Sequence, residues 1–118
     1  MEERLVLGLT EEITIYGPKR SEKVTARIDT GATSSSLDSK LAEKLQLKEL
    51  KDVKIVKSAS GVGRRSVVHA TVIIHGKTLE GDFTLANRSH MTYLVLIGQN
   101  ILKQGRFLID PLKKAQDK

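Results

Sequence analysis

The pattern of apolar and polar positions along the chain predicts mainly short β-strands. Residues 24–28 alternate apolar and polar side chains, which is typical of a strand with one buried face. Helical spacing near residues 39–46 predicts one short helix, for which Asp38 or Ser39 is a candidate N-cap, and residues 98–104 are a candidate second helix. The expected fold class is therefore all-β with one or two short helices. Further strands are expected at residues 6–9, 13–16, 53–56, 67–75, 78–85, 93–97 and 106–109.

Short polar or glycine-containing segments separate these strands. Residues 58–65 are small and polar between two apolar runs, which predicts the tip of a β-hairpin. Residues 87–92 are expected to form a loop. With 118 residues and no internal repeat or linker, the chain has room for one domain. We assign this domain to residues 1–111 and expect the charged residues 112–118 to form a disordered tail.

Composition narrows the possible classes of function. The chain has no cysteine, which excludes a disulfide framework, a thiolate metal site and a cysteine nucleophile. No signal peptide is evident and no apolar run approaches the ~20 residues of a membrane-spanning helix, so a cytoplasmic location without membrane association is expected. The net charge of +6 permits acidic partners. Nucleic acid is not an expected partner, because aromatic residues are few and no nucleic-acid-binding motif is present.

One segment carries candidate chemistry, Ile28-Asp29-Thr30-Gly31-Ala32. Here an acid follows a predicted β-strand and enters a tight turn that contains glycine. A carboxylate held in such a turn can be directed into a cleft, and Gly31 allows another backbone to approach closely. Taken alone, the segment has two interpretations, which are an ordinary turn with a capping aspartate and a catalytic loop.

A second segment, residues 94–102, changes the balance between these interpretations. Its apolar strand ends at Gly98 and is followed by the candidate helix. In this order, and about 70 residues apart, the two segments resemble those of the retropepsins, the short homodimeric aspartic proteases of retroviruses. In that family the Asp-Thr/Ser-Gly-Ala segment forms the catalytic loop, and the later apolar-apolar-Gly strand packs beneath it. Residues 60–63 lie between the two segments, where the family has its glycine-rich flap.

Longer patterns extend the resemblance over residues 5–111. They are Asp29-Thr30-Gly31-Ala32-x-x-Ser35-x-Leu37, Ser58-x-Ser60-Gly61 with Arg65, Leu85-Ala86-Asn87-Arg88-Ser89-x-Met91, Leu96-Ile97-Gly98 and Phe107-Leu108-Ile109-Asp110-Pro111. In these patterns the chain is similar to bacterial and archaeal retropepsin-like proteins that are often labelled ATP-dependent zinc proteases. Some of these proteins accompany ATP-grasp ligases that add glutamate tails to ribosomal protein. The resemblance implies a closed retropepsin-like β-barrel and an ATP-grasp ligase as a candidate partner.

The resemblance also implies an aspartic endopeptidase that acts as a homodimer without metal or cofactor. One chain supplies one Asp-Thr-Gly, whereas aspartic protease chemistry needs two carboxylates, so the implied dyad is Asp29 from each of two chains. Thr30 would hydrogen-bond across the twofold axis, and Gly31 would accept substrate backbone. The residues implied to contact the substrate are Ala32, Ser60, Gly61, Val62, Gly63, Arg64, Arg65 and Arg88.

Two departures from the viral pattern occur together. Retropepsins usually have an aspartate where Thr33 stands and an arginine where Gln99 stands, and in the family these two residues form an ion pair. The loss of both leaves no stranded charge and suggests that the catalytic loop is held differently here. Arg88 has two interpretations, which are a replacement cation and a solvated arginine of the loop. The departures also favour an alternative function, a catalytically inactive dimer that binds a peptide or a partner protein.

The remaining cations and the histidines raise two further hypotheses. Arg64 and Arg65 at the predicted flap would attract an acidic peptide substrate, such as a glutamate-rich tail, unless they are simply solvated charges. A zinc-dependent hydrolase would need ligands from the three histidines, His69, His75 and His90. The first two would face the same way on one strand, but His90 lies in a distant loop. We therefore expect scattered histidines and no metal.

Overall fold

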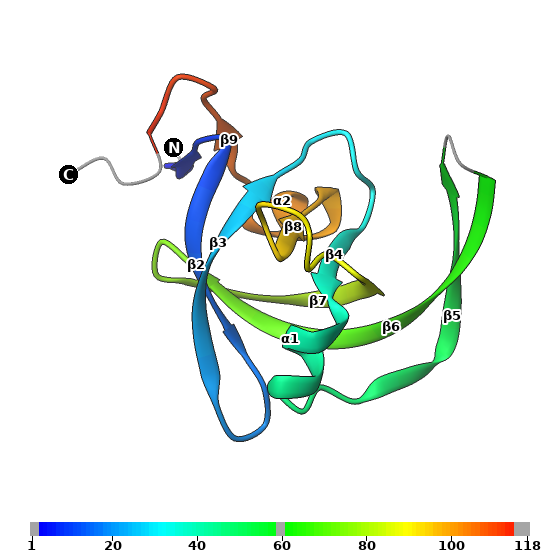
Figure 1. The fold of residues 1–118 in the computed structure, drawn as a ribbon. Helices are drawn as coiled ribbons and strands as arrows, with labels where there is room; N and C mark the ends of the chain where they lie inside the picture. Colours follow the sequence, from blue (N-terminus) through cyan, green and yellow to red (C-terminus); the bar gives the residue numbers. More distant parts are fainter. Residues whose placement is uncertain (1–2, 59–60, 115–118) are drawn as a thin grey trace.

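The computed structural model describes residues 3–58 and 61–114, which form nine strands and two short helices (Figure 1). The helices are α1 (Ser39–Lys44) and α2 (Gln99–Gly105), both within two residues of their predicted ends. Within the described residues, neither helix is long and apolar enough to cross a membrane. The strands are β1 (Val6–Leu7), β2 (Thr10–Tyr16), β3 (Ser21–Ile28), β4 (Ser35–Asp38), β5 (Glu49–Ser58), β6 (Gly61–Ile74), β7 (Lys77–Ala86), β8 (Val95–Ile97) and β9 (Leu108–Ile109).

Six of the strands close into a barrel. They follow the order β2-β3-β8-β4-β7-β6, and the pairing of β2 with β6 completes the ring. β5 pairs antiparallel with β6, and the two strands project from the barrel as a long hairpin (Figure 1). The closed β-barrel with two short helices confirms the predicted fold class.

Alternation along the strands gives the barrel its apolar interior. Ile13 and Ile15 on β2, and Val72 and Ile74 on β6, are at most 1% exposed, while the residues between them are partly exposed. Phe83 on β7 is the largest of the fully buried side chains in the described residues. Each such side chain contributes roughly 1.5–3 kcal/mol by leaving water. The barrel is therefore a rigid frame for the turns at its ends.

β4 is a strand that the sequence pattern did not predict. Residues 35–38 are all buried, although three of them are polar. β4 pairs parallel with β7 and antiparallel with β8, so its backbone groups find partners on both sides. The Ser35 hydroxyl accepts from the Gly98 N–H at 2.9 Å and donates to Asn100 Oδ1 at 2.8 Å. These long-range contacts, and not a local propensity, make a serine-rich segment into a buried strand.

Asp38 ends β4 and serves as the N-cap of α1, and it is one of the two residues predicted for that position. Its Oδ2 accepts hydrogen bonds from the Lys40 and Leu41 N–H groups, both at 3.2 Å. Its Oδ1 accepts from the Arg88 N–H at 2.8 Å. One buried side chain therefore anchors both α1 and the loop that follows β7.

The first and last strands form a separate two-stranded sheet beside the barrel. β1 and β9 run parallel, with Val6 opposite Leu108 and Leu7 opposite Ile109. Leu7 is fully buried, whereas Val6 and Leu108 are 40% and 45% exposed. One side of this small sheet thus packs on the core and the other presents apolar side chains to solvent.

A buried acid lies next to this sheet. Glu11 is 1% exposed, and its carboxylate accepts hydrogen bonds from the Gly8 N–H at 2.7 Å and Lys113 Nζ at 2.9 Å. His75 Nε2 lies 2.8 Å from the other carboxylate oxygen. We call these four residues the Glu11 cluster. Lys113 belongs to the segment 112–118 that we assigned as a tail, and the last four residues of that segment lie outside the described residues.

The Glu11 cluster shifts the titration of its acid. Burial alone would raise the pKa of Glu11, but hydrogen bonds from Lys113, Gly8 and His75 outweigh it, and the pKa lies below its ordinary value. The carboxylate is therefore ionised at neutral pH and joins the N-terminal strands to the segment after β9.

Candidate active site

Asp29 stands where β3 ends and the chain enters a tight turn. Its backbone N–H donates to the Ile97 carbonyl at 2.9 Å, which continues the parallel pairing of β3 with β8. Its Oδ1 accepts a hydrogen bond from the Gly31 N–H at 2.9 Å. Asp29 is partly buried, while Thr30 and Gly31 are exposed. The carboxylate is thus fixed by rigid backbone and remains accessible to a second group.

Gly98 brings the end of β8 against this turn. A Cβ atom at this position would lie 2.3 Å from the Ser34 carbonyl oxygen and 2.9 Å from that of Ala32, so a larger residue would displace the turn. Directly after it, the Gln99 N–H donates to the Ala32 carbonyl at 2.8 Å. The apolar-apolar-Gly segment therefore supports the turn that carries Asp29.

Gln99 shows how the turn is held without an ion pair. Its side-chain amide donates to the Thr30 carbonyl at 2.7 Å. Thr33, at the other position that departs from the viral pattern, is exposed, and its carbonyl accepts from the Asn100 N–H at 3.3 Å. Hydrogen bonds from α2 to backbone oxygens of the turn thus take the place of a charged pair.

A cleft of about 370 Å³ opens beside the Asp29 turn, and we call it the turn cleft. Residues from the turn, β4, β5, β6, β7, β8 and the loop after β7 line it. Four residues of the predicted site are among them, which are Gly31, Ala32, Arg65 and Arg88. The others are Thr33, Ser34, Ser36, Ile55, Thr84 and Leu96. The structure therefore gathers part of the predicted catalytic loop and two of the three predicted arginines around one cavity.

Arg88 reaches the turn cleft from the loop after β7. Its backbone N–H is bound by Asp38, and its Nε donates to the Tyr93 carbonyl at 2.9 Å. Burial lowers the pKa of Arg88, the positive charge of Arg65 lowers it further, and Asp38 acts in the opposite direction. Arg88 is therefore a half-buried cation in a fixed position that shares the cleft with a second cation.

The predicted flap corresponds to the end of the β5–β6 hairpin. Ser60 lies outside the described residues. Arg64 is exposed and lines a separate pocket of about 520 Å³ beside α1, whereas Arg65 borders both that pocket and the turn cleft. The structure thus separates two arginines to which the sequence analysis gave one role. The remaining flap residues are paired with β5, and they are Gly61, Val62 and Gly63.

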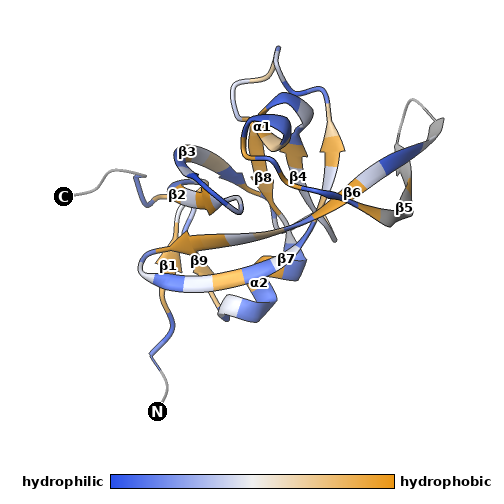
Figure 2. Cartoon of the chain, turned by 90° about the horizontal axis from the view of Figure 1, so that it is seen from below, coloured by the Kyte–Doolittle hydropathy of each residue, from blue (hydrophilic) through white to orange (hydrophobic). Residues whose placement is uncertain are grey.

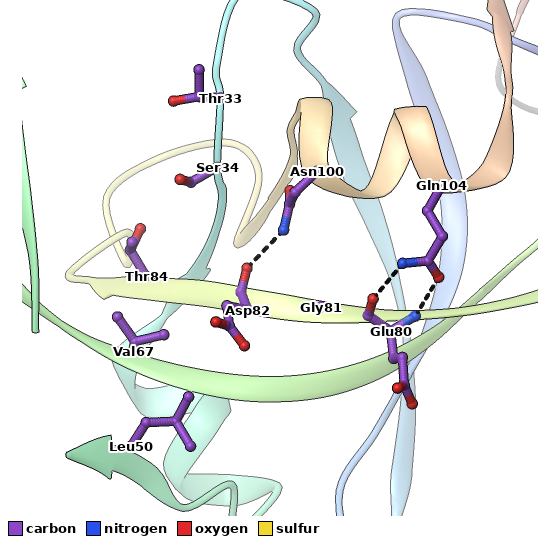
Figure 3. Close-up of a pocket in the computed structure, with 10 residues that line it drawn as sticks. All are labelled: Thr33, Ser34, Leu50, Val67, Glu80, Gly81, Asp82, Thr84, Asn100 and Gln104. Atoms are coloured by element: carbon purple, nitrogen blue, oxygen red, sulfur yellow. Dashed lines mark hydrogen bonds between the residues drawn. The ribbon is translucent and has the colours of Figure 1, made fainter. Parts of the chain in front are cut away.

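A third cavity, a pocket of about 600 Å³, adjoins the turn cleft (Figure 3). On the side formed by β7 and α2, the Asn100 side chain donates to the Asp82 carbonyl at 3.0 Å. The Gln104 amide exchanges two hydrogen bonds with the Glu80 backbone, at 2.7 and 3.0 Å. These contacts hold α2, and with it the support of the Asp29 turn, against β7. The residues that line both cavities are Thr33, Ser34 and Thr84.

The histidines do not gather in one place. His69 lies on β6, and its Nδ1 is 2.9 Å from Asp82 Oδ1. His75 lies in the turn beyond β6, with a φ of 50°, so the two do not share a strand face as their spacing suggested. His90 is exposed in the loop after β7. Across residues 3–58 and 61–114, no group of three or more histidine, aspartate or glutamate side chains is placed to hold a metal ion.

A comparison with models of protein families assigns the chain to one family. A sequence profile of the RimB-like family, described as retropepsin-like aspartic endopeptidase RimB, matches residues 38–118. The chain belongs to the RimB-like family. The family description names an aspartic endopeptidase and does not confirm the zinc-protease label that came with the sequence resemblance. The match begins at Asp38, so it includes Arg65 and Arg88 of the turn cleft but not the Asp29 turn.

Solved structures show the fold of this RimB-like chain. A Legionella pneumophila protein of unknown function aligns with a TM-score of 0.70 and 19% identity, over 98% of this chain and 100% of that chain. The EIAV protease complexed with the inhibitor HBY-793 aligns with a TM-score of 0.66 and 16% identity, over 91% and 92%. The Simian Foamy Virus protease aligns with a TM-score of 0.59 and 19% identity, over 80% and 91%. A comparison with curated proteins found no match. At these identities the structures establish the retropepsin-like fold.

Two groups at the site were missed or undervalued in the sequence. Ser36 on β4 borders the turn cleft and is 7% exposed, and its hydroxyl has no hydrogen-bond partner among the residues that the structure describes. A run of three serines is typical of a loop, so the sequence gives little signal for this position. Gln99 stood out only as a departure from the viral pattern, yet its amide fastens the Asp29 turn.

Proposed function

We propose that the protein is an aspartic endopeptidase whose active site forms between two copies of the chain, each supplying Asp29. The observation that carries the proposal is the position of Asp29, which lies in a rigid turn beside a cleft. The retropepsin-like fold and the family of aspartic endopeptidases support it. Since one chain has one Asp-Thr-Gly turn, a partner copy must supply the second carboxylate.

The proposed chemistry follows from the closeness of two carboxylates. At about 3 Å they cannot both ionise, so the pair shares a single proton. The ionised carboxylate takes a proton from a water molecule as the water attacks the amide carbon. The protonated carboxylate donates to the carbonyl oxygen. The two apparent pKa values of such a pair belong to the dyad and not to one copy.

The residues around Asp29 have roles that follow from the same proposal. Thr30 is exposed next to Asp29, so its hydroxyl is available to the partner copy. Gly31 and Ala32 border the turn cleft with little side-chain volume, which leaves room for the substrate backbone. Residues 60–63 are proposed to contact the substrate from the hairpin. We take residues 1–111 as the catalytic unit and keep an ATP-grasp ligase as a candidate partner.

The sheet of β1 and β9 offers a surface for the second copy. Figure 2 shows hydrophobic colouring on both strands. A pocket of about 400 Å³ is lined by Thr30 of the Asp29 turn and by Ile109 of β9, so the turn and this strand border the same cavity. Contact with a second copy would remove apolar area from water and bring two turns together. The exposed apolar residues here are Leu5 at 39%, Val6 at 40%, Leu9 at 46%, Leu108 at 45% and Leu112 at 89%.

The deciding experiment compares the wild-type protein with Asp29→Asn on a peptide library from acid to neutral pH. We expect the variant to lose roughly 10²–10⁴-fold in rate, because it lacks a group that transfers a proton. Glu12→Gln is the matched control, since it removes one exposed carboxylate on β2 with the same change in charge. Chelator should have no effect. Chelator-sensitive cleavage that survives Asp29→Asn would instead indicate a zinc-dependent hydrolase.

Mixtures of wild type and Asp29→Asn test the shared site directly. If both copies supply a carboxylate, activity should fall with the square of the wild-type fraction, because mixed dimers have an incomplete dyad. A linear fall would contradict the dyad. If no peptide is cleaved although peptides bind, the alternative function applies, which is a catalytically inactive peptide- or partner-binding dimer.

A further inference from the structure

Gln99 contacts the Asp29 turn at two carbonyl groups. Its backbone N–H donates to the Ala32 carbonyl at 2.8 Å, and its side-chain Nε2 donates to the Thr30 carbonyl at 2.7 Å. These two carbonyls belong to the residues on either side of Gly31. Gln99 is the first residue of α2, so both donors come from one end of a helix that packs on the barrel. A single residue therefore holds the turn before and after its glycine.

The peptide group between Thr30 and Gly31 is bound at both of its ends. Its carbonyl oxygen accepts from Gln99, and its N–H donates to Asp29 Oδ1 at 2.9 Å. A peptide group is planar, and in the usual trans form its C=O and N–H point in opposite directions. A rotation that broke the bond to Gln99 would therefore also turn the N–H away from the carboxylate. The orientation of this group fixes the direction from which Asp29 receives its hydrogen bond.

The two hydrogen bonds of this peptide group also strengthen each other. A donor on the carbonyl oxygen polarises the group and makes its N–H a stronger donor. Both bonds lie at exposed positions, where water competes for the same groups. Burial therefore does not hold the Asp29 carboxylate in this orientation, and the bond from Gln99 contributes directly to it.

The surroundings of Gln99 favour a donor without charge. Arg4, Lys103 and Arg106 line the same pocket of about 400 Å³ as Gln99 and Thr30. Among the described residues, no carboxylate lines this pocket. A further cation at position 99 would add like charge without a counter-ion, whereas an amide supplies an N–H donor and adds no charge.

We propose that Gln99 is a positioning residue for the catalytic carboxylate and acts through the Thr30–Gly31 peptide group. We call this chain of two hydrogen bonds the Gln99 relay. The proposal rests on the proposed function, because it concerns the orientation of Asp29 in the dyad. Gln99 does not line the turn cleft, so it is not expected to touch the peptide. Its loss should therefore lower kcat and change KM little.

Gln104 provides the matched control on the same helix. Its Nε2 donates to the Glu80 carbonyl at 2.7 Å, the same distance as in the bond from Gln99 to Thr30. Substitution of either glutamine by methionine removes a neutral amide from α2 and keeps the length of the side chain. A general loosening of α2 would follow from either change, whereas the Gln99 relay responds only to the change at position 99.

The first measurement follows the Gly31 N–H by NMR in the full-length protein and needs no activity. We expect Gln99→Met and Gln99→Ala to speed the exchange of this N–H with water about fivefold, the effect of one neutral hydrogen bond. Gln104→Met should leave the exchange within about twofold of the wild-type rate. Thermal melts of each variant check that it is folded.

The second measurement is the kinetics of peptide cleavage. In Gln99→Met we expect kcat to fall about tenfold and KM to stay within about twofold, because the variant misplaces a reacting group without removing a contact to the peptide. Gln99 and Ile109 of β9 line the same pocket, so the assay is repeated at rising protein concentration to detect weaker association. The loss of kcat should persist where activity per chain no longer rises.

Three results would overturn the Gln99 relay. They are unchanged Gly31 exchange in both Gln99 variants, an equal effect of Gln104→Met on that exchange, and a loss of kcat that disappears at high protein concentration. If the wild-type protein cleaves no peptide, the proposed catalysis fails, while Gly31 exchange still decides whether Gln99 orients the turn. If the wild type cleaves peptide and the Gln99 variants keep its kcat, the positioning role alone is contradicted.

Discussion

The Glu11 cluster and the turn cleft differ in how far their charged and polar groups are paired within the chain. Glu11 is 1% exposed, and both of its carboxylate oxygens contact donors from its own chain. In the turn cleft, Arg65 and Arg88 share one cavity, and the Ser36 hydroxyl beside them has no partner. The first region is complete within one chain. Among the described residues that line the second region there is no carboxylate, although Asp38 acts on Arg88 from outside the lining.

The comparison teaches that burial of a charged group does not by itself indicate function. A buried ion with all its hydrogen bonds satisfied holds the fold together, and its removal leaves its partners unpaired. Polar groups that remain unsatisfied in an open cavity indicate binding. The number of partners therefore distinguishes the two regions better than the degree of burial does.

Removing the Glu11 carboxylate should have the largest effect on the stability of the protein. In Glu11→Ala the Gly8 N–H loses its acceptor, and the Lys113 ammonium loses its carboxylate partner and keeps the Val6 carbonyl, which should cost about 3–5 kcal/mol of unfolding free energy. Urea denaturation at one protein concentration measures this loss. A loss below about 1 kcal/mol would mean that the cluster is no more than a surface ion pair.

Protonation of Glu11 at acid pH should lower the stability of the protein more gradually than the substitution does. Because the pKa of Glu11 is lowered in the folded state, its contribution is complete above its ordinary value of 4.5 and is lost as the pH falls through the folded pKa. One group changes stability by at most about 1.4 kcal/mol per pH unit. Thermal midpoints of wild type should therefore fall more steeply below pH 4.5 than those of Glu11→Gln. Parallel curves would contradict the lowered pKa.

The smallest effect on stability is expected in the turn cleft. Ser36→Ala removes a hydroxyl that has no partner in the described part of the chain, so the unfolding free energy should stay unchanged or rise by up to about 1 kcal/mol. Ser35→Ala is the matched control on the same strand and should cost about 1–3 kcal/mol, because the Gly98 N–H loses its acceptor. Denaturation curves of the two variants give the comparison. Equal losses would show that Ser36 has a partner after all.

The parts of the fold with local signals could be predicted from the sequence. The alternating pattern gave most of the strands, and Asp38 was a candidate cap because capping needs only a side chain and the next turn of backbone. β4 could not be predicted, because a serine-rich segment becomes a strand only through its neighbours β7 and β8. The pairing of β1 with β9 depends in the same way on segments at opposite ends of the chain.

The residues of the candidate site also differ in whether a local sequence pattern could predict them. The Asp29 turn and its support at Gly98 were predicted from residues that resemble a family pattern, and the structure places them in contact. The different surroundings of Arg64 and Arg65 follow from strand alternation, which the prediction of a polar hairpin tip obscured. Ser36 gave no signal, since its lack of a hydrogen-bond partner is a property of three-dimensional surroundings.

The small parallel sheet bears on the order in which the chain folds. Val6 and Leu108 pair across almost the whole length of the chain, so loop-closure entropy opposes their meeting, and two strands of two residues return few hydrogen bonds. We expect β9 to dock last and to open first. The same sheet carries the apolar surface proposed for the second copy, so association would stabilise the docked strand. Completion of the fold and completion of the dyad would then be a single event, dependent on protein concentration.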